Sequence, residues 1–176
     1  MKQSILLAAG VAAILVAGAC SKGGNGTAQR QPGMWETKAK ITSLQLTGAP
    51  PEVQARANSQ VGQERTASEC LTAEQARDPM AQMRQMMASQ GPTANCTFSD
   101  QTFAGGVIRV HGTCPAAGGG SAEITLEGTF TETTMQATMN VNASGPASAA
   151  MPGVTGMRIA VETQGRRTGD CPGGNR

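Results

Sequence analysis

Cysteine thiols offer this sequence its widest choice of chemistry, because they can form disulfides, bind metal or attack as thiolates. The chain has five cysteines. Four lie in the body of the sequence, at Cys70, Cys96, Cys114 and Cys171. None of these is close enough to another for the C-x-x-C pairs typical of zinc sites. An even number of cysteines without metal-ligand spacing predicts two disulfides.

A predicted hairpin selects the pairing. Ala104-Gly105-Gly106 is a turn signal between two strand-like runs. If the turn is centred on Gly105, Cys96 and Cys114 lie directly opposite each other with their side chains on one face. The predicted bonds are therefore Cys96–Cys114 and, by elimination, Cys70–Cys171. The second bond would tie the strand that precedes the predicted helix to the C-terminal tail.

The single histidine, His111, lies opposite Ser99 in the same register. A Ser–His pair suggests nucleophilic catalysis, which also needs an orienting carboxylate and an oxyanion hole. Strict alternation places the neighbouring Asp100 on the other face of its strand. We therefore interpret the pair as a contact on a solvent-exposed face and predict that the chain is not an enzyme. Hydrolysis through His111 is kept as the weakest hypothesis.

Methionines offer a different chemistry. The chain has ten of them, and Met80, Met83 and Met87 have the spacing of one helix face. Thioethers bind Cu(I), so a periplasmic copper site is the alternative function. The same spacing is typical of a core-facing stripe, and Met fills gaps in cores that are poor in aromatic residues. Core packing is the preferred interpretation, and no cofactor is predicted.

Alternating apolar and polar residues predict the strands that must position these groups. The predicted strands lie at 33–41, 63–70, 122–130, 135–141 and 157–161, with two more inside 96–114. Thr72 and Gln75 have the capping-box spacing, and Asp78-Pro79 is a second helix start. They predict a short turn at 73–77 and a helix at 79–89. The predicted fold is mainly β (α+β): an antiparallel meander of six or seven strands with one short inserted helix.

The N-terminus predicts export. Lys2 precedes an apolar run from Ile5 to Val16, which is typical of a secretory signal and shorter than the roughly 20 residues of a membrane span. The small residues 17–19 before Cys20 resemble a bacterial lipobox, although the usual Leu is Ala17. We expect a signal peptide at 1–19, lipidation with palmitate at Cys20 and sorting to the outer membrane. In lipoproteins, an Asp directly after the lipidated Cys commonly causes retention in the inner membrane, and this chain has Ser21 at that position.

The residues after Cys20 complete the predicted layout. Residues 21–31 are polar and Gly-rich, which is typical of a flexible tether, so residues 20–31 are a lipidated Cys with its linker and 32–176 are a single domain. Ala17 and Ala19 also fit ordinary signal peptidase, so simple secretion stays open.

Composition limits the partners. The formal net charge is +2, and no basic cluster is present, which argues against nucleic acid because it is bound by neutralising phosphates. Aromatic residues make up 2% of the chain, one Trp and three Phe with no Tyr, so stacking surfaces for bases are scarce. A core with so few large side chains gains from cross-links.

Several short motifs resemble an exported bacterial family of unknown function, DUF3617. They are Pro32-Gly33-Met34-Trp35-Glu36, Glu69-Cys70-Leu71-Thr72-Ala73-Glu74, Asn95-Cys96, Cys114-Pro115, Gly128 in its hairpin, and Gly169-Asp170-Cys171. The resemblance covers residues 32–171; the long Ala/Ser/Gly loop predicted at 142–156 departs from the pattern. It implies the exported compartment and the fold, and it implies no activity.

The resulting hypothesis is an uncharacterised cell-envelope lipoprotein with a non-catalytic binding or interaction domain on the periplasmic side. It would be held at the membrane by its N-terminal lipid and would contact an unknown envelope protein or ligand.

Overall fold

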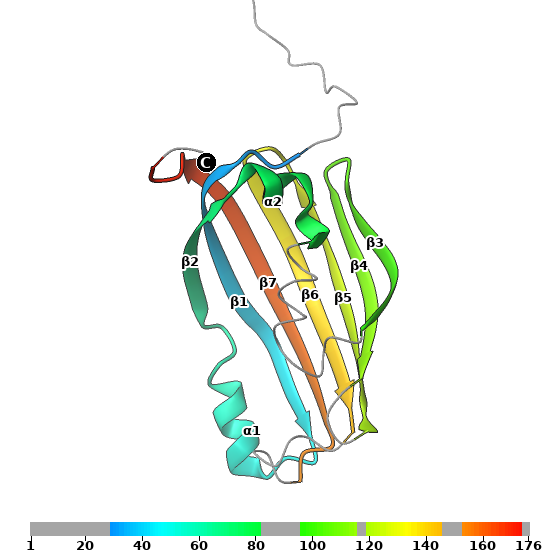
Figure 1. The fold of residues 1–176 in the computed structure, drawn as a ribbon. Coiled ribbons are helices and arrows are strands. Elements are labelled where there is room, and N and C mark those ends of the chain that lie inside the picture. The colour runs from blue at the N-terminus through cyan, green and yellow to red at the C-terminus, as the bar shows by residue number, and fades with distance from the viewer. Residues whose placement is uncertain (1–28, 82–95, 116–118, 146–152, 174–176) are drawn as a thin grey trace, which may run out of the picture.

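The computed structural model describes residues 29–81, 96–115, 119–145 and 153–173 of the chain (Figure 1). The predicted signal peptide, Cys20 and most of the tether lie outside these residues. So does most of the helix predicted at 79–89, of which only residues 79–81 are described, in helical conformation.

Seven antiparallel strands form one sheet, which confirms the mainly β fold. They are β1 (Gly33–Thr47), β2 (Glu64–Leu71), β3 (Thr97–Ala104), β4 (Val107–Pro115), β5 (Ser121–Phe130), β6 (Thr134–Ser144) and β7 (Gly156–Gly169). Strands β3 to β7 are a meander, as predicted. The order is β2-β1-β7-β6-β5-β4-β3, so the first strand pairs with the last and places β2 at one edge.

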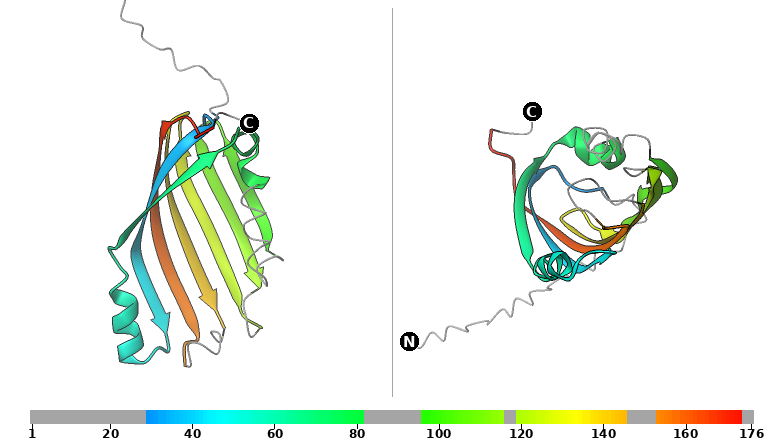
Figure 2. Two further views of the ribbon diagram at one scale, coloured as in Figure 1. Left: turned by 60° about the vertical axis from the view of Figure 1, so that its left-hand side comes forward. Right: turned by 90° about the horizontal axis from the view of Figure 1, so that it is seen from below.

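The sheet curves into a trough (Figure 2). In the end-on view its two edge strands, β2 and β3, lie on opposite sides of the opening, and helix α2 (Ala73–Arg77) lies between them. Register shifts in β1, between Met34 and Trp35 and between Ile41 and Ser43, mark bulges. Bulges bend a strand and increase its twist, and β1 needs such bends to follow the trough.

The inner face of the trough holds the core, because alternate residues of each strand point inward. Two buried clusters lie there. One joins Trp35 and Leu71 to Ala76 of α2. The other contains Ile108, Phe130 and Ala137, with Phe103 and Leu126 beside them. Met135 packs against both clusters, so it connects the α2 end of the sheet to the β4–β6 region.

The helices differ in part from the prediction. The short turn predicted at 73–77 is α2, and both hydrogen bonds of its Thr72/Gln75 capping box are present. The chain also contains helix α1 (Pro51–Asn58), which was not predicted, so the expectation of one inserted helix is wrong. Among the described residues, no helix has both the length and the apolar character that crossing a bilayer requires.

The β3–β4 hairpin corrects the predicted register. Its turn is the pair Gly105-Gly106, both with positive φ (61° and 80°), which suits a two-residue hairpin loop. Ala104 therefore pairs with Val107, one position away from the predicted register. A bulge lies between Phe98 and Asp100. On the side of the bulge away from the turn the pairing follows the predicted register, and Thr97 pairs with Thr113.

The loop predicted at 142–156 is shorter than expected. Strand β6 continues to Ser144, which pairs with Gly156 at the start of β7. Residues 146–152 lie outside the described part of the chain.

Candidate functional site

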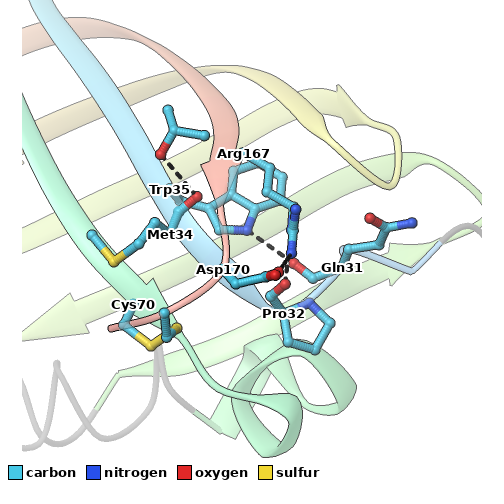
Figure 3. A network of polar contacts seen from close by, with 9 residues as sticks. Gln31, Pro32, Met34, Trp35, Cys70, Arg167 and Asp170 are labelled. Carbon is cyan, nitrogen blue, oxygen red and sulfur yellow. Dashed lines mark hydrogen bonds and ion pairs between the residues drawn. A yellow bond between two sulfur atoms is a disulfide. The ribbon is translucent and has the colours of Figure 1, made fainter. Parts of the chain in front are cut away.

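Polar contacts join the segment before β1 to the end of β7 (Figure 3). The indole N–H of Trp35, whose side chain is 2% exposed, donates to the carbonyl oxygen of Gln31 at 3.0 Å. Nε of Arg167 donates to the carbonyl oxygen of Pro32 at 2.8 Å. The same guanidinium forms an ion pair with Asp170. These contacts hold the N-terminal segment against the end of β7.

The disulfide Cys70–Cys171 completes this fastening, with a Cα–Cα distance of 5.5 Å. It joins β2 to the residues that follow β7. We call the contacts of residues 31–35, 70, 167 and 170–171 the clasp. The clasp contains or adjoins most residues of the motifs at 32–36 and 169–171. These motifs therefore have a structural role.

Arg30 lies inside the trough, directly before the clasp. Its guanidinium carbon is 5.5 Å from the ring centroid of Trp35 and 5.3 Å from that of Phe103. Cation–π contacts at these distances stabilise the charge. Nη1 also lies 4.0 Å from the sulfur of Met135. The ring of Phe130 packs in turn against that of Phe103, with 4.7 Å between the ring centroids.

The charge of Arg30 is incompletely compensated. Burial lowers the pKa of its guanidinium, and the carboxylate of Glu69 opposes that shift. Nε of Arg30 is buried and has no hydrogen-bond partner among the described residues. An unsatisfied buried donor costs free energy, and a buried charge costs more. The described fold therefore holds a cation with one buried donor, Nε, that no described residue satisfies.

A cavity of about 200 Å³ opens beside this cation. We call it the Arg30 cavity; it is lined by Gln29, Arg30, Ala76, Arg77, Pro79, Phe103, Ala104 and Phe130. Two of these residues are cationic, and the others are mostly apolar or aromatic. Neither Arg30 nor Arg77 forms an ion pair with another described residue. The cavity therefore presents two guanidinium groups beside the half-buried ring of Phe103, whereas Phe130 is only 5% exposed.

The outer, polar face carries a second arrangement. Oγ of Ser99 lies 3.1 Å from Nδ1 of His111, and Nε2 of His111 lies 2.9 Å from Oε1 of Glu123. The predicted Ser99–His111 contact is present, and the carboxylate is supplied by β5. Asp100 pairs with His111 in the register, which corrects the expectation that it faces away. Its carboxylate instead accepts a hydrogen bond from Thr102.

This row of side chains is open to solvent. The side chains of His111 and Glu123 are 45% and 54% exposed. Strict alternation does not reveal the bulge at Ser99, which places Asp100 opposite His111. The contact of His111 with Glu123 was not predicted, because it depends on how β4 and β5 pair. Glu123 lies diagonally across from His111, whose direct partner on β5 is Thr125.

The predicted disulfides are both present, with a Cα–Cα distance of 4.0 Å for Cys96–Cys114. Of the methionines considered for copper, only Met80 is described; Met83 and Met87 lie outside the described residues, as does Cys20. Within the described ranges, His, Cys, Asp and Glu form no group of three that could hold a metal ion. No sequence motif marks Arg30, so its position beside the aromatic rings was not predicted.

Comparison with known proteins identifies a family and no characterised relative. Neither the curated proteins nor the solved structures contain a match to the chain. The family model described as protein of unknown function DUF3617 matches residues 30–171. That range begins at Arg30, ends at Cys171 of the clasp, and spans the whole described sheet. The chain therefore belongs to the DUF3617 family.

Proposed function

We propose that this protein is an envelope lipoprotein whose β domain works by binding a ligand or partner, and that it is held on the periplasmic side of the outer membrane through Cys20. The observation that carries the proposal is the Arg30 cavity, which lies where the tether enters the fold. Binding sites are typically concave and mostly apolar, with a few polar groups that orient the ligand. The Arg30 cavity is concave and presents polar groups, two guanidinium groups among them, beside the half-buried ring of Phe103.

The outer face favours binding over catalysis as well. Ser99, His111 and Glu123 form a hydrogen-bonded row, but nucleophilic catalysis also relies on stabilising the oxyanion in a site that excludes water. Half-exposed side chains of His111 and Glu123 do not provide that exclusion. We therefore interpret the row as a cross-strand contact that strengthens the β3–β4–β5 region.

Membrane fractionation tests the anchor. The parent protein should sediment with the outer membrane, and a Cys20→Ser variant should appear in the soluble periplasmic fraction. Cys96→Ser is the matched control, because it changes a cysteine of the folded domain, and it should still fractionate with the membrane. Retention of Cys20→Ser in the membrane would contradict the lipid anchor.

Turnover measurements test the claim that the domain is not an enzyme. The purified protein is incubated with chromogenic esters, and any activity is compared between the parent, His111→Ala and Arg109→Gln. We expect no turnover above the buffer rate. Turnover that His111→Ala abolishes and Arg109→Gln retains would overturn the proposal, since Arg109 lies on the same strand outside the hydrogen-bonded row.

A further inference from the structure

We propose that two copies of this chain associate through their β2 strands, which pair antiparallel about Ala67 and join the two sheets into one. This inference goes beyond the proposed function, because it assigns an interaction surface at one edge of the sheet, whereas the Arg30 cavity is lined by no residue of β2. Three features of β2 carry it: free backbone groups, the lack of a feature that blocks pairing, and complementary charges.

The backbone groups of β2 point in directions that follow from the hydrogen bonds of the sheet. The N–H of Arg167 in β7 donates to the carbonyl oxygen of Thr133, which precedes β6, so odd-numbered residues of β7 face β6 and even-numbered ones face β1. Even-numbered residues of β1 therefore face β7, and its odd-numbered residues face odd-numbered residues of β2. The N–H and C=O groups of Thr66 and Ser68 consequently point away from the sheet, where no described strand pairs with them.

Strand β2 also lacks the features that commonly stop an edge strand from pairing, which include Pro, Lys and β-bulges. Its sequence contains neither Pro nor Lys, and it pairs with β1 without a register shift. Strand β3, at the opposite edge, has a bulge between Phe98 and Asp100. Every residue of β2 except Leu71 is exposed. Strand β2 is therefore the edge that a further strand can extend.

The charges of β2 select the partner. Arg65 and Glu69 lie on the same face of the strand, four residues or about 13 Å apart, so they cannot pair within one chain. Both are exposed, and neither forms an ion pair with another described residue, although Glu69 acts electrostatically on Arg30. When two copies pair antiparallel about Ala67, Arg65 of each copy lies opposite Glu69 of the other. This twofold arrangement forms two opposite-charge pairs.

The same register also satisfies the backbone. It places Thr66 of one copy opposite Ser68 of the other, and these are residues whose backbone groups point to the free edge. Each such pair can exchange two hydrogen bonds. A shift of two residues in either direction keeps backbone bonding possible, but it places Arg65 opposite Ala67 or Leu71 and leaves its charge unpaired. Backbone and charge therefore favour one pairing, and a second copy of the chain provides both.

Sedimentation equilibrium of the full exported protein, in a density-matched neutral detergent, measures the association. Because the interface is a single pair of short strands, we expect weak association, with mainly monomer at about 10 µM and mainly dimer at about 1 mM. The dilute monomer keeps an unpaired β2 edge, and amide exchange at low concentration is that of the monomer. A single-chain mass over the whole concentration range would overturn the inference.

Charge reversal tests the register. Arg65→Glu and Glu69→Arg each set like charges opposite one another, and each should raise the dissociation constant about tenfold or more. A mixture of the two variants restores both opposite-charge pairs, so it should associate as the parent does. Arg109→Glu makes the same charge change on β4 and should have no effect. Equal association of the parent and Arg65→Glu would overturn the proposed pairing, as would a mixture of folded variants that fails to associate.

Proline substitution tests the backbone bonds independently of charge. The N–H of Thr66 points to the free edge, so Thr66→Pro removes a donor from the proposed interface and none from the β1–β2 ladder. This variant should keep both disulfides in non-reducing peptide mapping and unfold near the temperature of the parent, but it should no longer dimerise. Ala67→Pro, which removes a donor from the ladder itself, should lower the unfolding temperature. Dimerisation of Thr66→Pro equal to that of the parent would overturn the inference, even if a charge variant failed to fold.

Discussion

Arg30 and Arg167 show how two side chains of one type take different roles. Arg167 donates to the carbonyl oxygen of Pro32 and forms an ion pair with Asp170, so its hydrogen bonds hold the N-terminal segment to β7. Arg30 lies between aromatic rings with a free Nε. The first arrangement stabilises the fold, whereas the second leaves a buried donor without a partner among the described residues, which costs free energy.

The contribution of Arg167 can be compared with that of Arg166 beside it. Arg167→Met removes a charge-assisted hydrogen bond from a side chain that is 21% exposed, and we expect a loss of about 1.5–3 kcal/mol in the free energy of unfolding. Arg166→Met breaks an ion pair with Glu36 from a side chain that is 68% exposed, and should cost below about 1 kcal/mol. Urea denaturation with the disulfides intact measures both. Equal losses would contradict the role given to the clasp.

Gly33 offers a second test at the residue scale. Its φ is +142°, and a Cβ there would collide with the carbonyl oxygen of Gly169 and the guanidinium of Arg167. Gly33→Ala should therefore destabilise the protein by about 2 kcal/mol or more, through strain and loss of clasp contacts. Gly169→Ala is the control, because nothing lies within 4 Å of a Cβ at that position. Thermal unfolding should separate the variants clearly; matching midpoints would show that the clasp tolerates movement.

At the scale of elements, the sequence predicted most strands because the inner and outer faces of the trough differ so strongly in polarity. Helix α1 escaped prediction because only Ala57 of its residues is buried, so it has no apolar stripe. No helix was predicted at Pro50 and Pro51, although Pro favours the first turn of a helix. The bulge at Ser99 depends on pairing across strands, which local alternation does not encode.

The two disulfides differ in the length of chain that they close. Cys70–Cys171 has a sequence separation of 101 and Cys96–Cys114 a separation of 18. In the loop-entropy model the bonds stabilise by about 4.7 and about 3 kcal/mol. Replacing Cys70 and Cys171 together by Ala should therefore cost more than replacing Cys96 and Cys114 together. Urea midpoints of the two double variants decide this, and the opposite order would show that native-state strain outweighs chain entropy.

At the scale of the whole molecule, the pairing of β1 with β7 joins the first two strands to the meander of β3 to β7 in one sheet. It brings the start of the domain beside its end, and the clasp and Cys70–Cys171 hold them there. The meander of β3 to β7 was predictable, but the position of β1 in the sheet was not, since no local pattern specifies a partner so distant in sequence. The Arg30 cavity was unpredictable for the same reason. Its lining comes from the segment before β1, from the α2 region, and from β3 and β5, which are separated along the chain.

This topology predicts how stability is distributed. Strand β7 is paired along both sides, with β1 and β6, whereas β2 pairs only with β1 and β3 only with β4. Every residue of β2 except Leu71 is exposed. An edge strand with little buried apolar surface can separate locally without unfolding the rest. Amide hydrogen exchange followed by mass spectrometry should therefore show the slowest exchange in β7 and β6 and the fastest in β2, with the Cys70 end of β2 slower than its Glu64 end because the disulfide and Leu71 hold it. Exchange in β2 as slow as in β7 along its whole length would contradict this prediction. It would show that a second molecule or another segment covers the edge of the sheet.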